Sequence, residues 1–151
     1  MADEDPRFAG KRRALLGTWT MLSWTREETA TGRRSDAFGP SPRGFITYTD
    51  DGRVMVLVIK RDRPRPAALP PTDAEKRALF DSMFAYSGTY EVQDDRVIHV
   101  IDASWNEAWT GTRQIRFLEL NGNRLTYRSP PAPDPMDGAE CVYRVEFEKV
   151  R

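Results

Sequence analysis

The sequence predicts an all-β protein in which about eight antiparallel strands close into an up-and-down barrel. Short runs rich in β-branched and aromatic residues recur along the chain, and turn residues separate them. Hairpin signals such as Asp-Gly and Asn-Gly join neighbouring runs, which makes those strands antiparallel. A barrel of eight such strands encloses side chains or one small ligand. A β-sandwich is the competing closure, and we expect one inserted helix and a short N-terminal helix besides the strands.

The chain length predicts a single domain over residues 1–151, with a flexible N-terminus of about residues 1–12. A chain of 151 residues has room for one core of ordinary size, and two independent cores would be cramped. Hydrophobic residues make up 39% of the chain, which is enough for a folded core and too much for a disordered segment.

Three strands are predicted in the first part of the chain. They cover residues 17–25 (GTWTMLSWT), 44–49 (GFITYT) and 54–59 (VMVLVI). Residues 27–34 and 39–42 read as loops, because charges, glycine and proline interrupt the pattern there. Asp50-Asp51-Gly52 predicts a tight hairpin turn, because Asp-Gly favours the left-handed backbone of such turns.

The middle of the chain predicts an exposed connection followed by the inserted helix. The prolines of residues 60–71 are incompatible with a regular helix or a central strand. Thr72 and Glu75 have the spacing of a capping box, which places the start of a helix there. Apolar residues at helical spacing then form a stripe that we expect to pack over the sheet or over an opening in it: Leu79, Phe80, Met83 and Phe84.

The second part of the chain predicts five more strands. They cover residues 86–92, 96–103, 109–120, 124–128 and 140–150. Residues 104–108 and 129–138 are predicted loops, and Asn121-Gly122 is a second hairpin signal. Cys141 alternates with apolar residues of the last strand, so we expect it to be a small buried group.

Charge and composition exclude several functions. Lysine and arginine together number 23, as do aspartate and glutamate, so the chain lacks the basic excess of a domain that binds nucleic acid through phosphates. One histidine and one cysteine exclude a multi-histidine or multi-cysteine metal site and an intramolecular disulfide. We therefore expect no metal and no cofactor. No apolar run is long enough to span a membrane, and the first residues lack a signal-peptide core, which predicts a cytoplasmic protein.

The residues also carry a family resemblance. Gly17-Thr18-Trp19 resembles the G-x-W signature of lipocalins, and it precedes a serial antiparallel pattern. Similarity to the bacterial lipocalin-like domain family covers nearly the whole chain, through the stretches LLGTWTMLSW, GPSPRGFITYTDDGRV, FAYSGTYEV, IHVIDASWNEAWTGT and QIRFLELNGNRLTYRSPP. The resemblance implies a lipocalin-like (calycin-like) barrel. Related barrels include carriers and cyclases that shape a reactive polyketide or lipid. Unlike secreted lipocalins, this sequence has no paired cysteines and has a helix in mid-chain.

Aromatic residues supply most of the candidate ligand-binding positions. Strand alternation places Trp19 on an inner face, where we expect it to close the base of the barrel. Trp24 has the opposite parity, so it faces outward unless a bulge turns it inward. Tyrosine and tryptophan combine apolar area with a hydrogen-bonding group, which suits a ligand with rings and carbonyls. The candidates, which ordinary core and surface positions would also explain, are Trp24, Tyr48, Tyr86, Tyr90, Trp105, Trp109, Gln114, Tyr127 and Tyr143.

His99, Arg116 and Asp102 are the candidate catalytic residues. His99 is the only side chain with an unperturbed pKa near neutrality, which suits a general acid or base, and a structural histidine is the alternative. Asp102 lies on the opposite face of a regular strand and would join His99 only through a bulge. Arg116 and Gln114 share one face, and if that face lines the lumen Arg116 would bind a carboxylate or enolate. The outer face is the other possibility for both.

The sequence thus supports three hypotheses of function. The first is a protein that binds a small apolar or aromatic molecule in the barrel lumen. The second is a cofactor-free cyclase or isomerase that acts on a polyketide-like or lipid-like substrate in the same cavity. The third is a protein–protein interaction module that uses the outer face of the sheet. A homodimer is also compatible with the sequence. Polar groups that converge in the lumen would favour chemistry over simple carriage.

Overall fold

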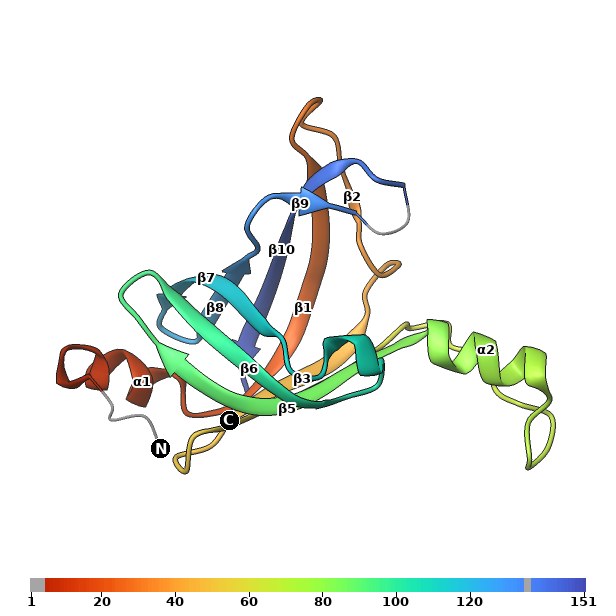
Figure 1. The fold of residues 1–151 in the computed structure, drawn as a ribbon, viewed down its shortest axis with the longest axis horizontal. Helices are drawn as coiled ribbons and strands as arrows, with labels where there is room; N and C mark the ends of the chain where they lie inside the picture. Colours follow the sequence, from red (N-terminus) through yellow and green to blue (C-terminus); the bar gives the residue numbers. More distant parts are fainter. Residues whose placement is uncertain (1–4, 135–136) are drawn as a thin grey trace.

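The computed structural model describes residues 5–134 and 137–151, and in those residues ten strands form one antiparallel sheet (Figure 1). The strands are β1 (Gly17–Glu28), β2 (Arg34–Asp36), β3 (Arg43–Tyr48), β4 (Arg53–Ile59), β5 (Met83–Val92), β6 (Arg96–Ser104), β7 (Arg113–Asn121), β8 (Arg124–Arg128), β9 (Ala132–Pro133) and β10 (Glu140–Lys149). Four short helices accompany them: η1 (Pro6–Phe8), α1 (Ala9–Leu15), α2 (Asp73–Asp81) and η2 (Glu107–Trp109).

The sheet closes on itself into a barrel. Its strand order within the described residues is β2-β1-β3-β4-β5-β6-β7-β8-β10-β9, and β1 also pairs with β10. Eight strands therefore form the closed barrel, while β2 and β9 extend its edges beside β1 and β10. Closure leaves no free edge in the barrel itself, so the predicted up-and-down barrel is confirmed and the sandwich is excluded.

One end of the barrel is closed by α1 and a tightly packed core. Trp19 and Leu15 are fully buried, and the indole Nε1 of Trp19 donates a hydrogen bond to the carbonyl oxygen of Leu15 at 2.8 Å. Arg12 of α1 donates to the carbonyl oxygen of Asp50 in the β3–β4 turn at 2.7 Å. The prediction that Trp19 closes the base is confirmed. Residues 1–4 of the expected flexible N-terminus lie outside the described residues, and the chain is helical from Pro6 onward.

A bulge in β1 decides which of its side chains enter the barrel. Met21 pairs with Phe147 and Ser23 pairs with Glu146, so Leu22 is the extra residue between two successive positions of β10. The bulge reverses the alternation of side chains beyond it. Trp24, which simple alternation places outside, is thereby opposite the inward-facing Val145 and packs against the core.

The inserted helix differs from the sequence expectation in position and packing. The capping box of Thr72 and Glu75 forms as predicted. No residue of α2 is buried, however, and the helix projects away from the barrel (Figure 1). Met83 and Phe84 belong to β5, because the chain returns to extended backbone after Asp81 to pair with β4. The predicted four-residue helical stripe is therefore wrong.

Three other boundaries also differ. The strand expected to begin at Trp109 begins at Arg113, because residues 107–109 form η2 and Gly111 has φ of +86°. The loop expected over residues 27–34 is shorter, since β1 continues to Glu28 and β2 starts at Arg34. The two residues of β9 lie within the predicted loop 129–138. These short pieces carry too little pattern to be recognised in sequence.

Candidate functional site

A hydrogen-bonded chain of buried aromatic side chains occupies the middle of the lumen. His99 of β6 is fully buried, and its Nε2 lies 2.7 Å from the hydroxyl of Tyr48 while its Nδ1 lies 2.6 Å from the hydroxyl of Tyr86. The Tyr48 hydroxyl also hydrogen-bonds the hydroxyl of Tyr127. The four residues come from β3, β5, β6 and β8, so the barrel itself assembles the chain. We call Tyr86, His99, Tyr48 and Tyr127 the central chain.

The central chain is electrically neutral near pH 7. Burial, together with the positive charge of Arg116, lowers the pKa of His99 well below its usual value. Burial likewise raises the pKa of Tyr48 and Tyr127 above the ordinary tyrosine value. A neutral imidazole donates from one nitrogen and accepts at the other. One of the two tyrosines bonded to His99 is therefore a donor and the other an acceptor, and a proton shift along the chain exchanges these roles.

Arg116 lies on the lumen side of β7. It pairs with Val97 of β6, which is fully buried, and Gln114 pairs with His99. Directly opposed residues in an antiparallel pair point to the same face, so the lumen-facing alternative for both side chains holds. The guanidinium counteracts the effect of burial on the pKa of Tyr86, partly through a hydrogen bond to that tyrosine. The Gln114 side-chain amide donates to the Thr112 hydroxyl at 2.9 Å.

Asp102 points out of the barrel. A guanidinium nitrogen of Arg53 lies 3.0 Å from its Oδ1, and the Ser87 hydroxyl donates to the same oxygen at 3.1 Å. The hydrogen bonds from Arg53 lower the pKa of Asp102. The register between β5 and β6 shifts at Asp102, which lies between the pairs Gly88–Ile101 and Ser87–Ala103. This bulge does not turn the carboxylate inward, because Asp102 is exposed whereas His99 is fully buried. Asp102 is therefore neither a partner of His99 nor a counterion of Arg116.

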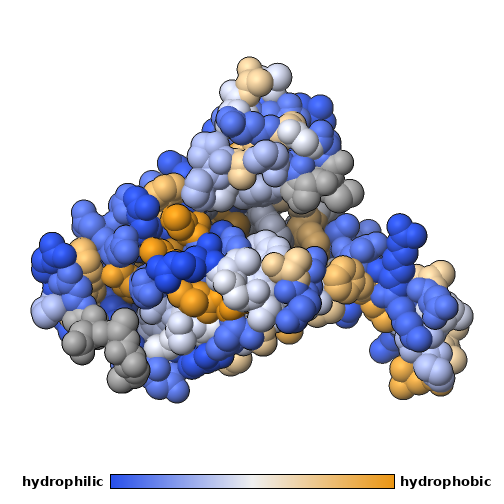
Figure 2. All heavy atoms as spheres, in the orientation of Figure 1, coloured by the Kyte–Doolittle hydropathy of each residue, from blue (hydrophilic) through white to orange (hydrophobic). Residues whose placement is uncertain are grey.

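Partly buried aromatic side chains surround the other end of the lumen, which we call the mouth. Phe84 is at their centre: its ring centroid lies 4.5 Å from that of Trp105, 5.0 Å from Trp109 and 5.3 Å from Trp24. Trp24 also stacks on Phe38 at 5.1 Å. All five are partly accessible to solvent. Figure 2 shows that the molecule is hollowed between its β9 end and the η2 segment, with apolar atoms inside the hollow.

Trp24 has an unusual feature at the mouth. Its indole Nε1 is buried, and no described residue accepts a hydrogen bond from it. A buried donor without an acceptor costs roughly 1–3 kcal/mol relative to a satisfied one. Trp24 therefore carries an unused hydrogen-bond donor among the rings of the mouth.

The last two predicted ligand-binding tyrosines lie at opposite ends of the barrel. Tyr90 packs against Tyr48 near the closed end, with ring centroids 4.9 Å apart, and its hydroxyl donates to the carbonyl oxygen of Thr49 at 2.9 Å. Tyr143 lies on β10 towards the other end, where its hydroxyl donates to a carboxylate oxygen of Asp134. Tyr90 is thus a structural core residue by its contacts, and Tyr143 belongs to a polar cluster beyond the mouth.

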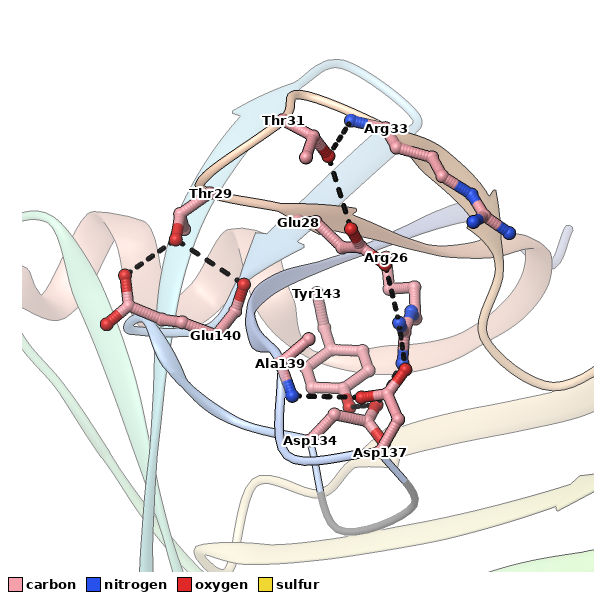
Figure 3. Close-up of polar contacts among 10 residues, drawn as sticks. All are labelled: Arg26, Glu28, Thr29, Thr31, Arg33, Asp134, Asp137, Ala139, Glu140 and Tyr143. Atoms are coloured by element: carbon pink, nitrogen blue, oxygen red, sulfur yellow. Dashed lines mark hydrogen bonds and ion pairs between the residues drawn. The ribbon is translucent and has the colours of Figure 1, made fainter.

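The polar cluster surrounds Arg26 (Figure 3). Its guanidinium lies 2.8 Å from Asp134, 2.6 Å from Asp137 and 3.2 Å from Glu28. Arg26 faces inward for the same reason as Trp24, because both follow the bulge at Leu22. The carboxylates hold the pKa of Arg26 above its usual value, with the hydrogen bond to Asp137 contributing most. The cluster links Asp134 and Asp137 to the inner side of β1.

The outer face carries one apolar patch. Phe45 of β3 and Leu57 of β4 are directly paired and are 51% and 52% exposed, and Met55 beside them is 55% exposed.

Among the described residues, no group of three or more His, Cys, Asp or Glu side chains is placed to hold a metal ion. No helix within those residues is long and apolar enough to cross a membrane.

Sequence reasoning missed several lumen residues. Phe84 was expected on the helix, and Phe38 fell in a region without a regular pattern. Arg26 was overlooked because the bulge at Leu22 cannot be read from alternation. A usable signal is the aromatic density of residues 105–109 next to a strand end, where the rings of Trp105 and Trp109 lie 5.7 Å apart.

One of the comparisons with known proteins shows the family. The sequence profile of the lipocalin-like domain matches residues 16–145. A crystal structure of a lipocalin-like protein from Bacteroides uniformis is similar at 11% identity and a TM-score of 0.49, covering 91% of this chain and 99% of that one. An uncharacterised protein from Bacteroides eggerthii is similar at 12% identity and a TM-score of 0.45, covering 90% and 99%. No curated protein matches the chain. The protein belongs to the lipocalin-like domain family.

Proposed function

We propose that the protein binds a small apolar or aromatic molecule in the mouth half of the barrel lumen. The observation that carries the proposal is the convergence of partly buried aromatic rings on Phe84 at an end of the barrel that α1 does not cover. Aromatic side chains left partly accessible in a concave site are typical of ligand pockets. Ring pairs contribute about 0.5–1.5 kcal/mol beyond area burial, so a planar ligand among several rings gains more than at one.

Thermal unfolding and calorimetry test this function. A panel of 2-naphthamide, flavone and decanamide is titrated into the protein, and at least one member is expected to raise the melting temperature and to bind at a single saturable site. Trp109→Ala is expected to weaken that binding about tenfold or more. Phe45→Ala is the matched control, because it removes an exposed ring from the outer face. No binding by any member, or equal weakening in both variants, would contradict the proposal.

A second candidate function is cofactor-free isomerisation or cyclisation, favoured by the central chain and Arg116. In an enolisable ketone, the hydroxyl oxygen of Tyr86 takes the α-proton while its own proton passes to Nδ1 of His99. The electron pair of the C–H bond forms a C=C bond, the π pair of the carbonyl moves to its oxygen, and the Arg116 guanidinium stabilises the resulting enolate. The step needs no oxidant and no metal.

Deuterium exchange tests this chemistry without knowledge of the natural substrate. In D₂O the protein is expected to accelerate loss of the α-proton signal of 2-tetralone, an enolisable bicyclic ketone. Tyr86→Phe is expected to abolish the acceleration, whereas Tyr90→Phe, which alters a hydroxyl bonded to Thr49, is expected to retain it. An exchange rate equal to that in buffer, or one unaffected by Tyr86→Phe, would eliminate this candidate.

A third candidate, contact with another protein or a second copy of the chain, is favoured by the exposed patch of Phe45, Met55 and Leu57. Light scattering over a range of concentrations tests self-association. The expected result is a dimer that Leu57→Asp converts to a monomer, and a monomer at all concentrations would remove the homodimer.

A further inference from the structure

Two arginines point into the barrel, and their surroundings differ. Arg26 lies within 3.2 Å of three carboxylates, those of Glu28, Asp134 and Asp137. Arg116, in contrast, forms no ion pair with any carboxylate in residues 5–134 or 137–151, and its hydrogen bonds go to uncharged groups, the carbonyl oxygen of Ile115 at 3.4 Å and the side chain of Tyr86. The fold therefore neutralises one inward guanidinium and leaves the other without a counterion.

The groups around Arg116 cannot neutralise it. The central chain contributes a histidine and three tyrosines, and burial keeps all four in their uncharged forms near pH 7. Gln114, the next lumen-facing residue of β7, is uncharged too, and Asp102 is on the outer face with Arg53. A half-buried guanidinium carries five N–H donors, and it is costly to remove from water without an anionic acceptor.

A different donor in the lumen lacks an acceptor altogether. The buried Nε1 of Trp24 comes from β1, on a different strand from Arg116, and it has no hydrogen-bond partner among the described residues. Buried donors in native proteins nearly always have partners. The lumen thus holds an N–H group without an acceptor and a guanidinium without a counterion, which come from different strands. A guanidinium binds planar oxyanions through charge-assisted hydrogen bonds.

We propose that the ligand is an organic anion: a planar aromatic or conjugated molecule whose carboxylate, phenolate or enolate oxygen is bound by Arg116. The apolar body of the ligand contacts the rings around Phe84, and the oxyanion reaches inward to the guanidinium beside Tyr86. This inference rests on the proposed binding function and assigns the chemical class of its ligand. In this arrangement the negative charge of the ligand neutralises the positive charge of Arg116, which has no counterion among the described residues.

A pair of probes of equal shape tests the inference on the unmodified protein. 2-Naphthoate is ionised at pH 7 and 2-naphthamide is neutral, while their ring systems are identical. Calorimetry is expected to show 2-naphthoate binding about tenfold or more tighter than 2-naphthamide, with a preference that weakens as salt is added. Equal affinity, or tighter binding of 2-naphthamide, would overturn the anion assignment while leaving the binding function intact. Failure of both probes to bind would refute the assignment and count against the binding function.

Two variants on the same strand locate the charge responsible. Arg116→Met is expected to remove the preference for 2-naphthoate and to leave the affinity for 2-naphthamide within about threefold. Arg113→Met removes the same charge from the outer face of β7, where Arg113 pairs with Glu91, and it is expected to keep the preference. A preference that survives in folded Arg116→Met, or that disappears equally in both variants, would contradict the role of Arg116. Should Arg116→Met fail to fold, the two probes on the unmodified protein still decide the ligand class.

Discussion

The two halves of the barrel use the same strands for different purposes. At the closed end Leu15, Trp19, Val54, Val97 and Leu125 are all fully buried. At the mouth the inward side chains are partly accessible and a tryptophan N–H lacks a partner, while Arg116 beside the central chain lacks a counterion. The closed end is a close-packed apolar core, whereas the mouth leaves apolar side chains partly exposed and a buried donor without a partner.

This difference indicates where stability and function reside. Apolar burial contributes about 25 cal/mol per Å² removed from water, so the closed end supplies much of the driving force for folding. The central chain lies between the halves and satisfies its polar atoms internally through His99. The mouth is then free to carry groups that are unfavourable for folding alone and useful only when a ligand enters.

The largest effect is expected from removing a ring at each end. Trp19→Ala deletes a fully buried indole and its hydrogen bond to Leu15, and it should lower the free energy of unfolding by about 3–5 kcal/mol. Trp109→Ala truncates a partly buried ring at the mouth and should cost less than half as much. Urea denaturation of both variants measures the difference. Equal losses would show that the two ends contribute alike to the core.

The next largest loss of stability is expected from replacing His99 in the central chain, which lies between the two halves of the barrel. His99→Leu leaves the hydroxyls of Tyr48 and Tyr86 without their imidazole partner and should cost about 2–4 kcal/mol of unfolding free energy. His99→Gln keeps a donor and an acceptor in one side chain, so it should be milder. Chemical denaturation compares the pair. If Leu is tolerated as well as Gln, the hydrogen bonds of the central chain do not contribute to stability.

The same histidine predicts a pH dependence. Its pKa in the folded protein lies well below the value of 6.5 for a free side chain, so the unfolded chain binds one more proton as the pH falls below about 6.5. Stability is therefore full above that pH and declines below it, by at most about 1.4 kcal/mol per pH unit, until the folded-state pKa is reached. His99→Gln should lack this component, which appears when its stability between pH 7 and 5 is subtracted from that of the unmodified protein. A difference that stays flat would contradict a buried neutral imidazole.

The smallest change in stability is expected at the bulge in β1, which directs the side chains after Leu22 towards the mouth. Leu22 is the extra residue and is 37% exposed, so Leu22→Thr should change the unfolding free energy by no more than about 0.5 kcal/mol. Met21→Thr, one position earlier and 8% exposed, should cost clearly more because it places a hydroxyl in the core. Thermal melts of the two variants report the ranking, and the opposite ranking would place the bulge elsewhere.

The fold was predictable because its signals are local. Alternating apolar residues and hairpin dipeptides predicted the antiparallel barrel, and Thr72 with Glu75 predicted the start of α2. The site was less accessible, because its contacts join residues far apart in the chain: Tyr48 is 51 positions from His99 and 79 from Tyr127. Alternation also fails at a bulge, which adds a residue without changing the local composition. The inward positions of Trp24 and Arg26 could therefore not be derived from the sequence.

The four tryptophans offer the most direct test of the central claim that the mouth half binds the ligand and the closed half does not. Trp24, Trp105 and Trp109 lie at the mouth, and Trp19 lies in the closed end. The protein labelled with 5-fluorotryptophan is titrated with 2-naphthoate and with 2-naphthamide and followed by ¹⁹F NMR. We expect saturable shifts of the three mouth signals with at least one probe, and an unchanged Trp19 signal. No shift with either probe, or a shift largest at Trp19, would contradict the account.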